Sequence, residues 1–173
     1  MNFVCRPRSW ANIRDQALKF RRMLNLSDEP YFPVMEVMEK ILDQRLGLIE
    51  LQIGTAAETK GAEGLTDPAG AFLMLRDDVY RLAWAGNGRA RFTASHELGH
   101  WVLHTGQPLA LARQGEDVAP FRQVEPQANR FAAELLMPAK FISSCDTEEQ
   151  IMDRHGVSRN AAANRLKSLI REA

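Results

Sequence analysis

The sequence predicts an α+β fold in which helices pack around a small antiparallel sheet. The chain has 173 residues, which is enough for one domain with a single core. Apolar residues make up 45% of the chain and charged residues 25%, proportions typical of folded globular proteins and not of disordered ones. The hydrophobic spacing is helical at first, alternates after residue 47 and is helical again after residue 90. These observations indicate two helices, then a sheet, then further helices.

Two helices are expected before the sheet. The first begins after Ser9, a favourable N-cap residue, and its inward stripe is Ile13, Ala17, Phe20 and Leu24. The second runs from Pro33, which suits the first helical position, to Gly47, which suits the end of a helix. The basic residues of the first helix are expected on a solvated face: Arg14, Lys19, Arg21 and Arg22.

One alternating segment and two apolar runs predict the strands. Residues 48–53 place every second residue, Ile49, Leu51 and Ile53, on one face of a first strand. A loop of small residues, 54–64, follows this strand. Residues 71–75 and 79–84 are expected to form a hairpin, with its turn at Asp77 and Asp78.

The next segment, residues 91–104, predicts a helix that carries a motif. Thr93 or Ser95 can cap its N-terminus, and Gly106 and Pro108 can stop its C-terminus. The motif is His-Glu-x-x-His, formed by His96, Glu97, Leu98, Gly99 and His100.

The spacing of this motif has a direct chemical meaning. On a helix, His96 and His100 project from one face, so both rings can bind the same zinc ion. Glu97 lies beside them and can take a proton from a water that attacks a carbonyl carbon. The motif therefore predicts a metallopeptidase site in which Glu97 is the general base.

Two histidines leave such a site one protein ligand short of three. Residues 125–137 predict a further helix, which ends at Pro138. Glu125 and Asn129 share one face of this helix. Glu125 is the preferred third ligand, and Asn129 can accept a hydrogen bond from the free ring nitrogen of a liganding histidine. Glu134, more than two turns further on, is the alternative ligand.

Both segments resemble the ImmA/IrrE family of metallopeptidases. The first block of matching residues is Arg91 to Thr93, Ser95 to His100, Leu103 and His104, and the second is Glu125, Gln127 to Asn129 and Phe131 to Pro138. The chain differs from the usual family pattern at Ser95 and Pro126.

The resemblance implies a zincin-like core, in which the motif helix packs on a small sheet, and a glutamate third ligand, here Glu125, beside His96 and His100. Histidine ligands suit zinc, and manganese is the alternative. The resemblance also implies cleavage of a helix-turn-helix repressor, which relieves repression of mobile-element or stress-response genes. Zincins often stabilise the oxyanion with a further side chain, and His104 and Tyr80 are the candidates here. His104 is alternatively a support for the site or a structural residue.

A pair of helices is expected at the C-terminal end. Thr147 and Gln150 have capping-box spacing, the first helix ends at Gly156, and the second follows Val157 and Ser158. The outline is that of a helix-turn-helix, so we divide the chain into a peptidase domain, 1–146, and a C-terminal pair, 147–173, packed on the same domain. Direct DNA contact by this pair is possible but is not the favoured interpretation.

Charge and cysteine content argue against a nucleic-acid-binding, membrane-surface or disulfide-bonded protein. Lysine plus arginine equals aspartate plus glutamate, 22 each, so the composition does not favour a nucleic-acid or membrane-surface protein. Cys5 and Cys145 form no recognisable disulfide or zinc framework, and the absence of an apolar leader or span indicates a cytoplasmic protein. The alternative function is a regulator or toxin–antitoxin component that binds a repressor or DNA and uses its metal only structurally.

Overall fold

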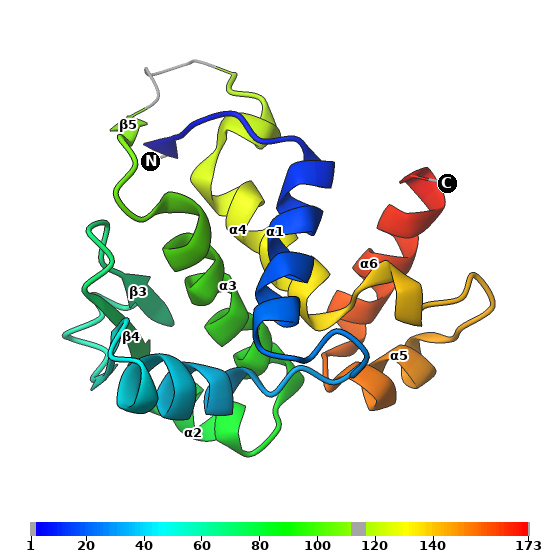
Figure 1. Ribbon diagram of the computed structural model, residues 1–173, viewed down its shortest axis with the longest axis horizontal. Helices are drawn as coiled ribbons and strands as arrows, with labels where there is room; N and C mark the ends of the chain where they lie inside the picture. Colours follow the sequence, from blue (N-terminus) through cyan, green and yellow to red (C-terminus); the bar gives the residue numbers. More distant parts are fainter. Residues whose placement is uncertain (1–2, 112–116, 173) are drawn as a thin grey trace.

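A computed structural model describes residues 3–111 and 117–172 of the chain, and it has the α+β architecture that the sequence predicts. Two helices, α3 (Gly88–His104) and α4 (Val124–Leu136), pack side by side at the centre (Figure 1). Helix α1 (Trp10–Met23) packs on α4, and Ser9 caps it as expected. The buried apolar residues of these helices, among them Leu98, Phe131 and Leu135, form one continuous core.

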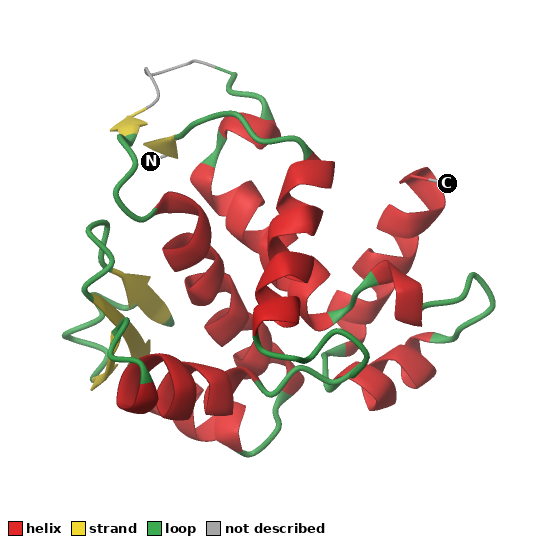
Figure 2. Cartoon of the chain, viewed as in Figure 1, coloured by secondary structure: helices red, strands yellow, loops and turns green. Residues whose placement is uncertain are grey.

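The strands gather at one side of the helices (Figure 2). Strands β2 (Glu50–Gly54), β4 (Phe72–Arg76) and β3 (Gly64–Thr66) form a sheet in that order. Strand β2 runs parallel to β4, and β3 runs antiparallel to it. The prediction of a wholly antiparallel sheet is therefore wrong, because β3, too short to show an alternating pattern, reverses the chain between β2 and β4.

The predicted hairpin after residue 71 is also wrong in its second half. Residues Asp77–Trp84 form helix α2, in which the buried residues Val79 and Ala83 are four positions apart. Asp77 and Asp78 lie in the first helical turn, where negative charge interacts favourably with the helix dipole. The two aspartates thus start a helix and do not form a hairpin turn.

The remaining N-terminal elements are η1 (Glu36–Arg45), a π-helix within the predicted second helix, and β1 (Phe3–Val4), which pairs with β5 (Ala110–Leu111). Two short 3₁₀ turns, η2 (Pro120–Arg122) and η3 (Ala139–Phe141), flank α4. Among the described residues, no helix combines the length and apolar character that a membrane span requires.

Helices α5 (Glu148–His155) and α6 (Arg159–Glu172) form the predicted C-terminal pair. The capping box of Thr147 and Gln150 is present, and Gly156 ends α5 in the left-handed conformation. Ile170 of α6 is 69% exposed. The guanidinium of Arg165, in contrast, is buried and bonds to the carboxylate of Glu134 on α4 at 2.5 and 3.0 Å, which fixes α6 on the helical core.

Candidate metal centre

The two motif histidines converge on one point at the surface of α3. The Nε2 atoms of His96 and His100 lie 2.8 Å apart, and both rings are largely buried. Helix α3 begins earlier than expected, since Asn87 caps it by accepting from two backbone amides, so Thr93 and Ser95 are not its N-cap. The histidines consequently lie in the middle of a long helix and not at a frayed end.

Glu125, in the first turn of α4, supplies the carboxylate that meets these rings. Its Oε2 lies 3.1 Å from Nε2 of His96, and its Oε1 lies 3.4 Å from Nε2 of His100. One ligand atom from each of the three residues falls within 4.8 Å of the others. Pro126, although it is a departure from the family pattern, is accommodated in the first helical turn, where a backbone N–H is not needed.

Hydrogen bonds fix the tautomers of the two motif histidines. Nδ1 of His96 lies 2.9 Å from Oδ1 of Asn129, an acceptor, so Nδ1 carries the proton and Nε2 keeps its lone pair. Nδ1 of His100 contacts Nδ1 of His104 at 3.3 Å, and Nε2 of His104 donates to Oε1 of Gln127 at 3.2 Å. Since His104 donates through Nε2, its Nδ1 is an acceptor for His100, whose Nε2 is therefore also unprotonated.

The pKa of each surrounding group follows from its contacts. Burial lowers the pKa of His104 to about 4, so its ring is neutral at neutral pH. The contacts of Glu125 with Nε2 of His100 and Nε2 of His96 hold the pKa of its carboxyl far below its usual range. Burial opposes the charged form of His96, but its hydrogen bond to the Glu125 carboxylate and the charge of Glu97 outweigh burial, so the pKa of His96 is raised. The two carboxylates thus favour a positive charge at Nε2, which a proton or a metal ion can supply.

The arrangement fits a bound cation. Two bare ring nitrogens at 2.8 Å repel one another unless a positive charge lies between their lone pairs. A carboxylate on the same side adds a third donor with negative charge. Two imidazole nitrogens and one carboxylate, with one side open to the cleft, form the donor set of a catalytic metal site, and they are not the groups of an apolar core.

Glu97 lies beside this cluster with its carboxylate directed into the cleft. Only 7% of the residue is exposed, and the hydroxyl of Thr66 on β3 donates to its Oε2 at 2.8 Å and to its main-chain oxygen at 3.0 Å. Gly64, also on β3, leaves the space that the Glu97 side chain fills, because a Cβ there would lie 2.6 Å from Cγ of Glu97. Strand β3 therefore shapes the position of the Glu97 carboxylate.

A cleft of about 930 Å³ opens over the cluster. Its walls come from β3 and the loop after it, from α3 and from the start of α4, and it includes His96, Glu97, His100, His104, Glu125 and Asn129. The free edge of β3 forms one rim, since β3 is the outermost strand of its sheet.

Two of the residues considered from the sequence lie elsewhere. The Tyr80 hydroxyl donates to Glu39 at 2.8 Å and does not line the cleft, so the structure does not bring Tyr80 to the site. Glu134 is fully buried among arginines and is not available as a ligand. His104 lines the cleft, but both of its ring nitrogens are engaged, which favours a supporting role over an oxyanion contact.

Three contributors to the site could not be found from the sequence: Gly64, Thr66 and Gln127. Gly64 and Thr66 belong to a strand of three residues without a recognisable pattern. Gln127 lies next to the predicted face of α4, and only the position of His104 reveals what it binds.

Comparison with known families gives one match. Residues 83–167 match the family model described as the IrrE N-terminal-like domain of the peptidase family M78. This segment contains α3, α4 and α5, so it includes both motif histidines, Glu97 and Glu125. No match is found among curated proteins. The family model confirms the resemblance that the two sequence blocks indicated, and through residues 83–167 the chain is a member of the ImmA/IrrE family, a metallopeptidase family.

Proposed function

We propose that this protein is a zinc-dependent endopeptidase that cleaves a helix-turn-helix transcriptional repressor and so relieves repression of mobile-element or stress-response genes. The observation that carries the catalytic part is the convergence of His96, His100 and Glu125 beside the buried carboxylate of Glu97. Membership of a metallopeptidase family supports the same reaction class. The site of action is proposed to be the cytoplasm, since the two cysteines are both free thiols.

His96, His100 and Glu125 would hold the ion. Imidazole and carboxylate donors in a three-residue set suit zinc best, and manganese is the second candidate. When bound, the ion supplies Lewis-acid chemistry, which polarises the scissile carbonyl and lowers the pKa of water. Asn129 and His104 act through the ligands, because each fixes the proton on the Nδ1 side of one imidazole.

Glu97 moves the proton in the proposed reaction. Its carboxylate accepts a proton from water as the water oxygen bonds to the carbonyl carbon. It then delivers that proton to the amide nitrogen as the carbon–nitrogen bond breaks, so one water is consumed and Glu97 is regenerated. The hydrogen bond from Thr66 keeps one carboxylate oxygen oriented through both transfers.

The metal part of the proposal is tested by metal analysis of purified protein. About one zinc per chain is expected for wild type, as for a single three-ligand site, and Glu125→Ala should lose it. Glu50→Ala, at an exposed glutamate on β2, is the matched control and should keep the metal. A wild-type chain that stays empty after incubation with zinc or manganese would refute the proposal.

The substrate part is tested with a helix-turn-helix repressor encoded near the gene for this chain. Intact-mass analysis should show two fragments whose masses sum to the repressor plus one water. Glu97→Gln should retain zinc yet cut at a rate lowered by at least about a hundredfold. A repressor that binds tightly but stays whole would favour the alternative regulator without hydrolytic activity.

A further inference from the structure

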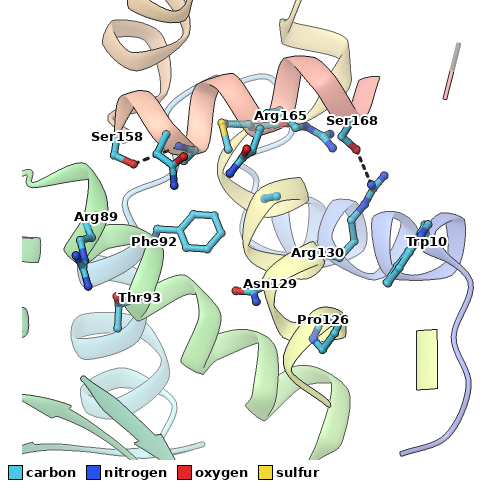
Figure 3. Close-up of a pocket in the computed structure, with 15 residues that line it drawn as sticks. Trp10, Arg89, Phe92, Thr93, Pro126, Asn129, Arg130, Ser158, Arg165 and Ser168 are labelled. Atoms are coloured by element: carbon cyan, nitrogen blue, oxygen red, sulfur yellow. Dashed lines mark hydrogen bonds between the residues drawn. The ribbon is translucent and has the colours of Figure 1, made fainter. Parts of the chain in front are cut away.

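A second cavity, of about 880 Å³, lies beside the metal cleft and has no role in the chemistry above. Figure 3 shows it between α3, which carries Phe92, and α6, which carries Ser168 and follows Ser158. Helix α4 contributes Asn129 and Arg130, and Trp10 of α1 lies at the far end. The cavity is thus walled by four helices, α1, α3, α4 and α6.

The two cavities adjoin one another. Phe92, Thr93 and Asn129 line both of them. Asn129 also bonds to His96, so the second cavity begins directly next to the metal cluster. A polypeptide with its scissile bond at the cluster would enter this cavity on one side of that bond.

The lining of the second cavity differs sharply in charge from that of the metal cleft. Four carboxylate residues, and no lysine or arginine, line the metal cleft: Glu63, Asp67, Glu97 and Glu125. The second cavity has the opposite character, since none of its lining residues is a carboxylate and three are arginines: Arg89, Arg130 and Arg165. The remainder is apolar, amide or hydroxyl in character, including Phe92, Met137 and Asn164.

The basic character continues beyond this cavity. An adjoining hollow shares Trp10, Arg130, Asn164 and Ser168 with it and adds Lys167, Arg171 and Glu172. Among the described residues, neither Lys167 nor Arg171 is in an ion pair, whereas Glu172 is held by Arg14 and Arg130. The second cavity and the adjoining hollow together form one groove, and two uncompensated cations of α6, Lys167 and Arg171, lie at its far end.

The arginines in the groove wall are already fixed. Arg165 and Arg130 both bind the buried carboxylate of Glu134, and Arg130 also donates to Ser168. The whole network holds three arginines (Arg14, Arg130, Arg165) against two glutamates (Glu134, Glu172), so it carries a net charge of plus one, although Arg14 itself does not line the groove. The wall is preorganised, so an incoming ligand would not have to order it.

We propose that this groove, from Phe92 to Lys167 and Arg171, binds an acidic segment of the substrate polypeptide on one side of the scissile bond. This inference rests on the proposed peptidase function. Lys167 and Arg171 would meet the acidic side chains, while Phe92 and Trp10 would contact apolar ones. Arg89, at the other end, already bonds to Glu63 at 2.7 Å. The groove would thus select substrates by charge at a distance from the reacting bond.

The test measures peptide binding to the full zinc-loaded chain carrying Glu97→Gln, which holds peptides without cutting them. The probes are three fluorescent peptide pools with randomised centres, flanked by glutamates, by glutamines or by lysines. The glutamate pool should bind about tenfold more tightly than the glutamine pool at low salt, and the lysine pool should bind most weakly. Added salt should reduce the difference.

Charge-reversed variants locate the effect. Lys167→Glu with Arg171→Glu should abolish the preference for the glutamate pool, and Asn164→Asp, nearly isosteric and within the groove, should weaken it. Arg22→Glu with Arg45→Glu makes the same charge change at exposed sites away from the groove and should leave the preference intact. Zinc content and thermal unfolding establish that each variant is folded. Equal binding of the three pools, or an equal loss in the control, overturns the proposal.

Cleavage by the wild-type chain separates this inference from the proposed function. If the wild-type chain cuts all three pools equally well, the proposed peptidase function is supported, but the proposal that the groove binds acidic segments is refuted. A preference in binding that is lost with Lys167→Glu and Arg171→Glu, without any cleavage by wild type, would support the groove and count against the peptidase.

Discussion

The carboxylate of Glu97 depends on Thr66, a residue of a strand that shows no sequence signature. The hydroxyl of Thr66 reaches both the side chain and the main-chain oxygen of Glu97, at 2.8 and 3.0 Å. A hydrogen bond to a charged group contributes about 1.5–3 kcal/mol, so this contact can decide how well the base is oriented.

We expect Thr66→Val to lower kcat by about tenfold or more, because the isosteric side chain removes the hydrogen bond and keeps the shape. Zinc content should stay at the wild-type level, since Thr66 contacts no ligand. Thr55→Val, in the loop after β2, removes a hydroxyl of the same size and should leave kcat unchanged. A wild-type kcat for Thr66→Val would show that Glu97 needs no such support.

Asn129 orients His96 through a hydrogen bond, as Thr66 orients Glu97. Its Oδ1 accepts from Nδ1 and leaves Nε2 free for the metal. We expect Asn129→Ala to weaken zinc affinity by about 10–100-fold, as for other partners of liganding histidines. Competition with a chromophoric chelator measures this, with Asn12→Ala on the exposed face of α1 as the control. If Asn129→Ala bound zinc as tightly as wild type, Asn129 would have no role in metal binding.

At the scale of elements, the metal cluster depends on how closely α3 and α4 approach one another. Gly99 lies between the two histidines, and a Cβ there would meet the main-chain oxygen of Ala128 and the ring of Phe131 at 3.1 Å. The absence of a side chain at this position therefore brings Glu125 within reach of both rings.

We expect Gly99→Ala to push the two helices apart, with a loss of about 1–3 kcal/mol of stability and a weaker metal site. Urea unfolding measures the first effect and zinc titration the second. Ala163→Ser, a comparable small change on the outer part of α6, should alter neither. If Gly99→Ala binds zinc normally, the approach of the helices is not what assembles the cluster.

The sequence predicted the helices better than the sheet, for a physical reason. Helices α1 and α5 carry caps that act locally, Ser9 and the pair Thr147 and Gln150, and all three are where the sequence placed them. Residues 79–84 are apolar except for Arg81, as in a buried strand, yet they form a helix that begins at two aspartates and buries Val79 and Ala83. The burial of these two residues depends on contacts with distant segments, which the local sequence does not show.

The charged residues show the same limit. Arg21 was expected on a solvated face, but it is buried and donates to the main-chain oxygen of Leu135 at 2.6 Å. His96, His100, Glu125 and Asn129, in contrast, are brought together as their helical spacing indicated. Spacing predicts which residues share a face of a helix, whereas the partner of a long side chain depends on the packing of distant segments.

At the scale of the whole molecule, Glu134 joins three segments that lie far apart in the sequence. Its fully buried carboxylate receives Arg14 from α1, Arg130 from α4 and Arg165 from α6. We expect Glu134→Gln to lower the free energy of unfolding by about 3–5 kcal/mol, because buried arginines lose their counter-charge. Glu149→Gln, at an exposed glutamate, should cost far less in the same urea titration. Similar losses in both variants would show that the network does not hold α6.

His155 makes the stability of the assembled molecule depend on pH. Its ring is buried where α5 meets the loop at Pro30, and Nδ1 donates to the main-chain oxygen of Pro30 at 3.0 Å. Nε2 is buried without a hydrogen-bond partner among the described residues. Burial lowers the pKa of His155, so the folded chain resists the protonation that the unfolded chain undergoes near its ordinary pKa of about 6.5.

A group whose pKa is depressed in the folded state and that is charged when protonated favours unfolding at low pH. The contribution of neutral His155 to the free energy of unfolding is fully present above the pKa of the unfolded state, about 6.5. It is lost as the pH falls below that value, by at most about 1.4 kcal/mol per pH unit. We expect His155→Gln, which keeps a donor for Pro30 but cannot titrate, to be less stable than wild type at neutral pH. The two free energies of unfolding should converge as the pH is lowered in urea titrations of the zinc-loaded proteins. Parallel curves would mean that His155 is protonated equally in both states, and that the junction of α5 with the loop at Pro30 tolerates a buried charge.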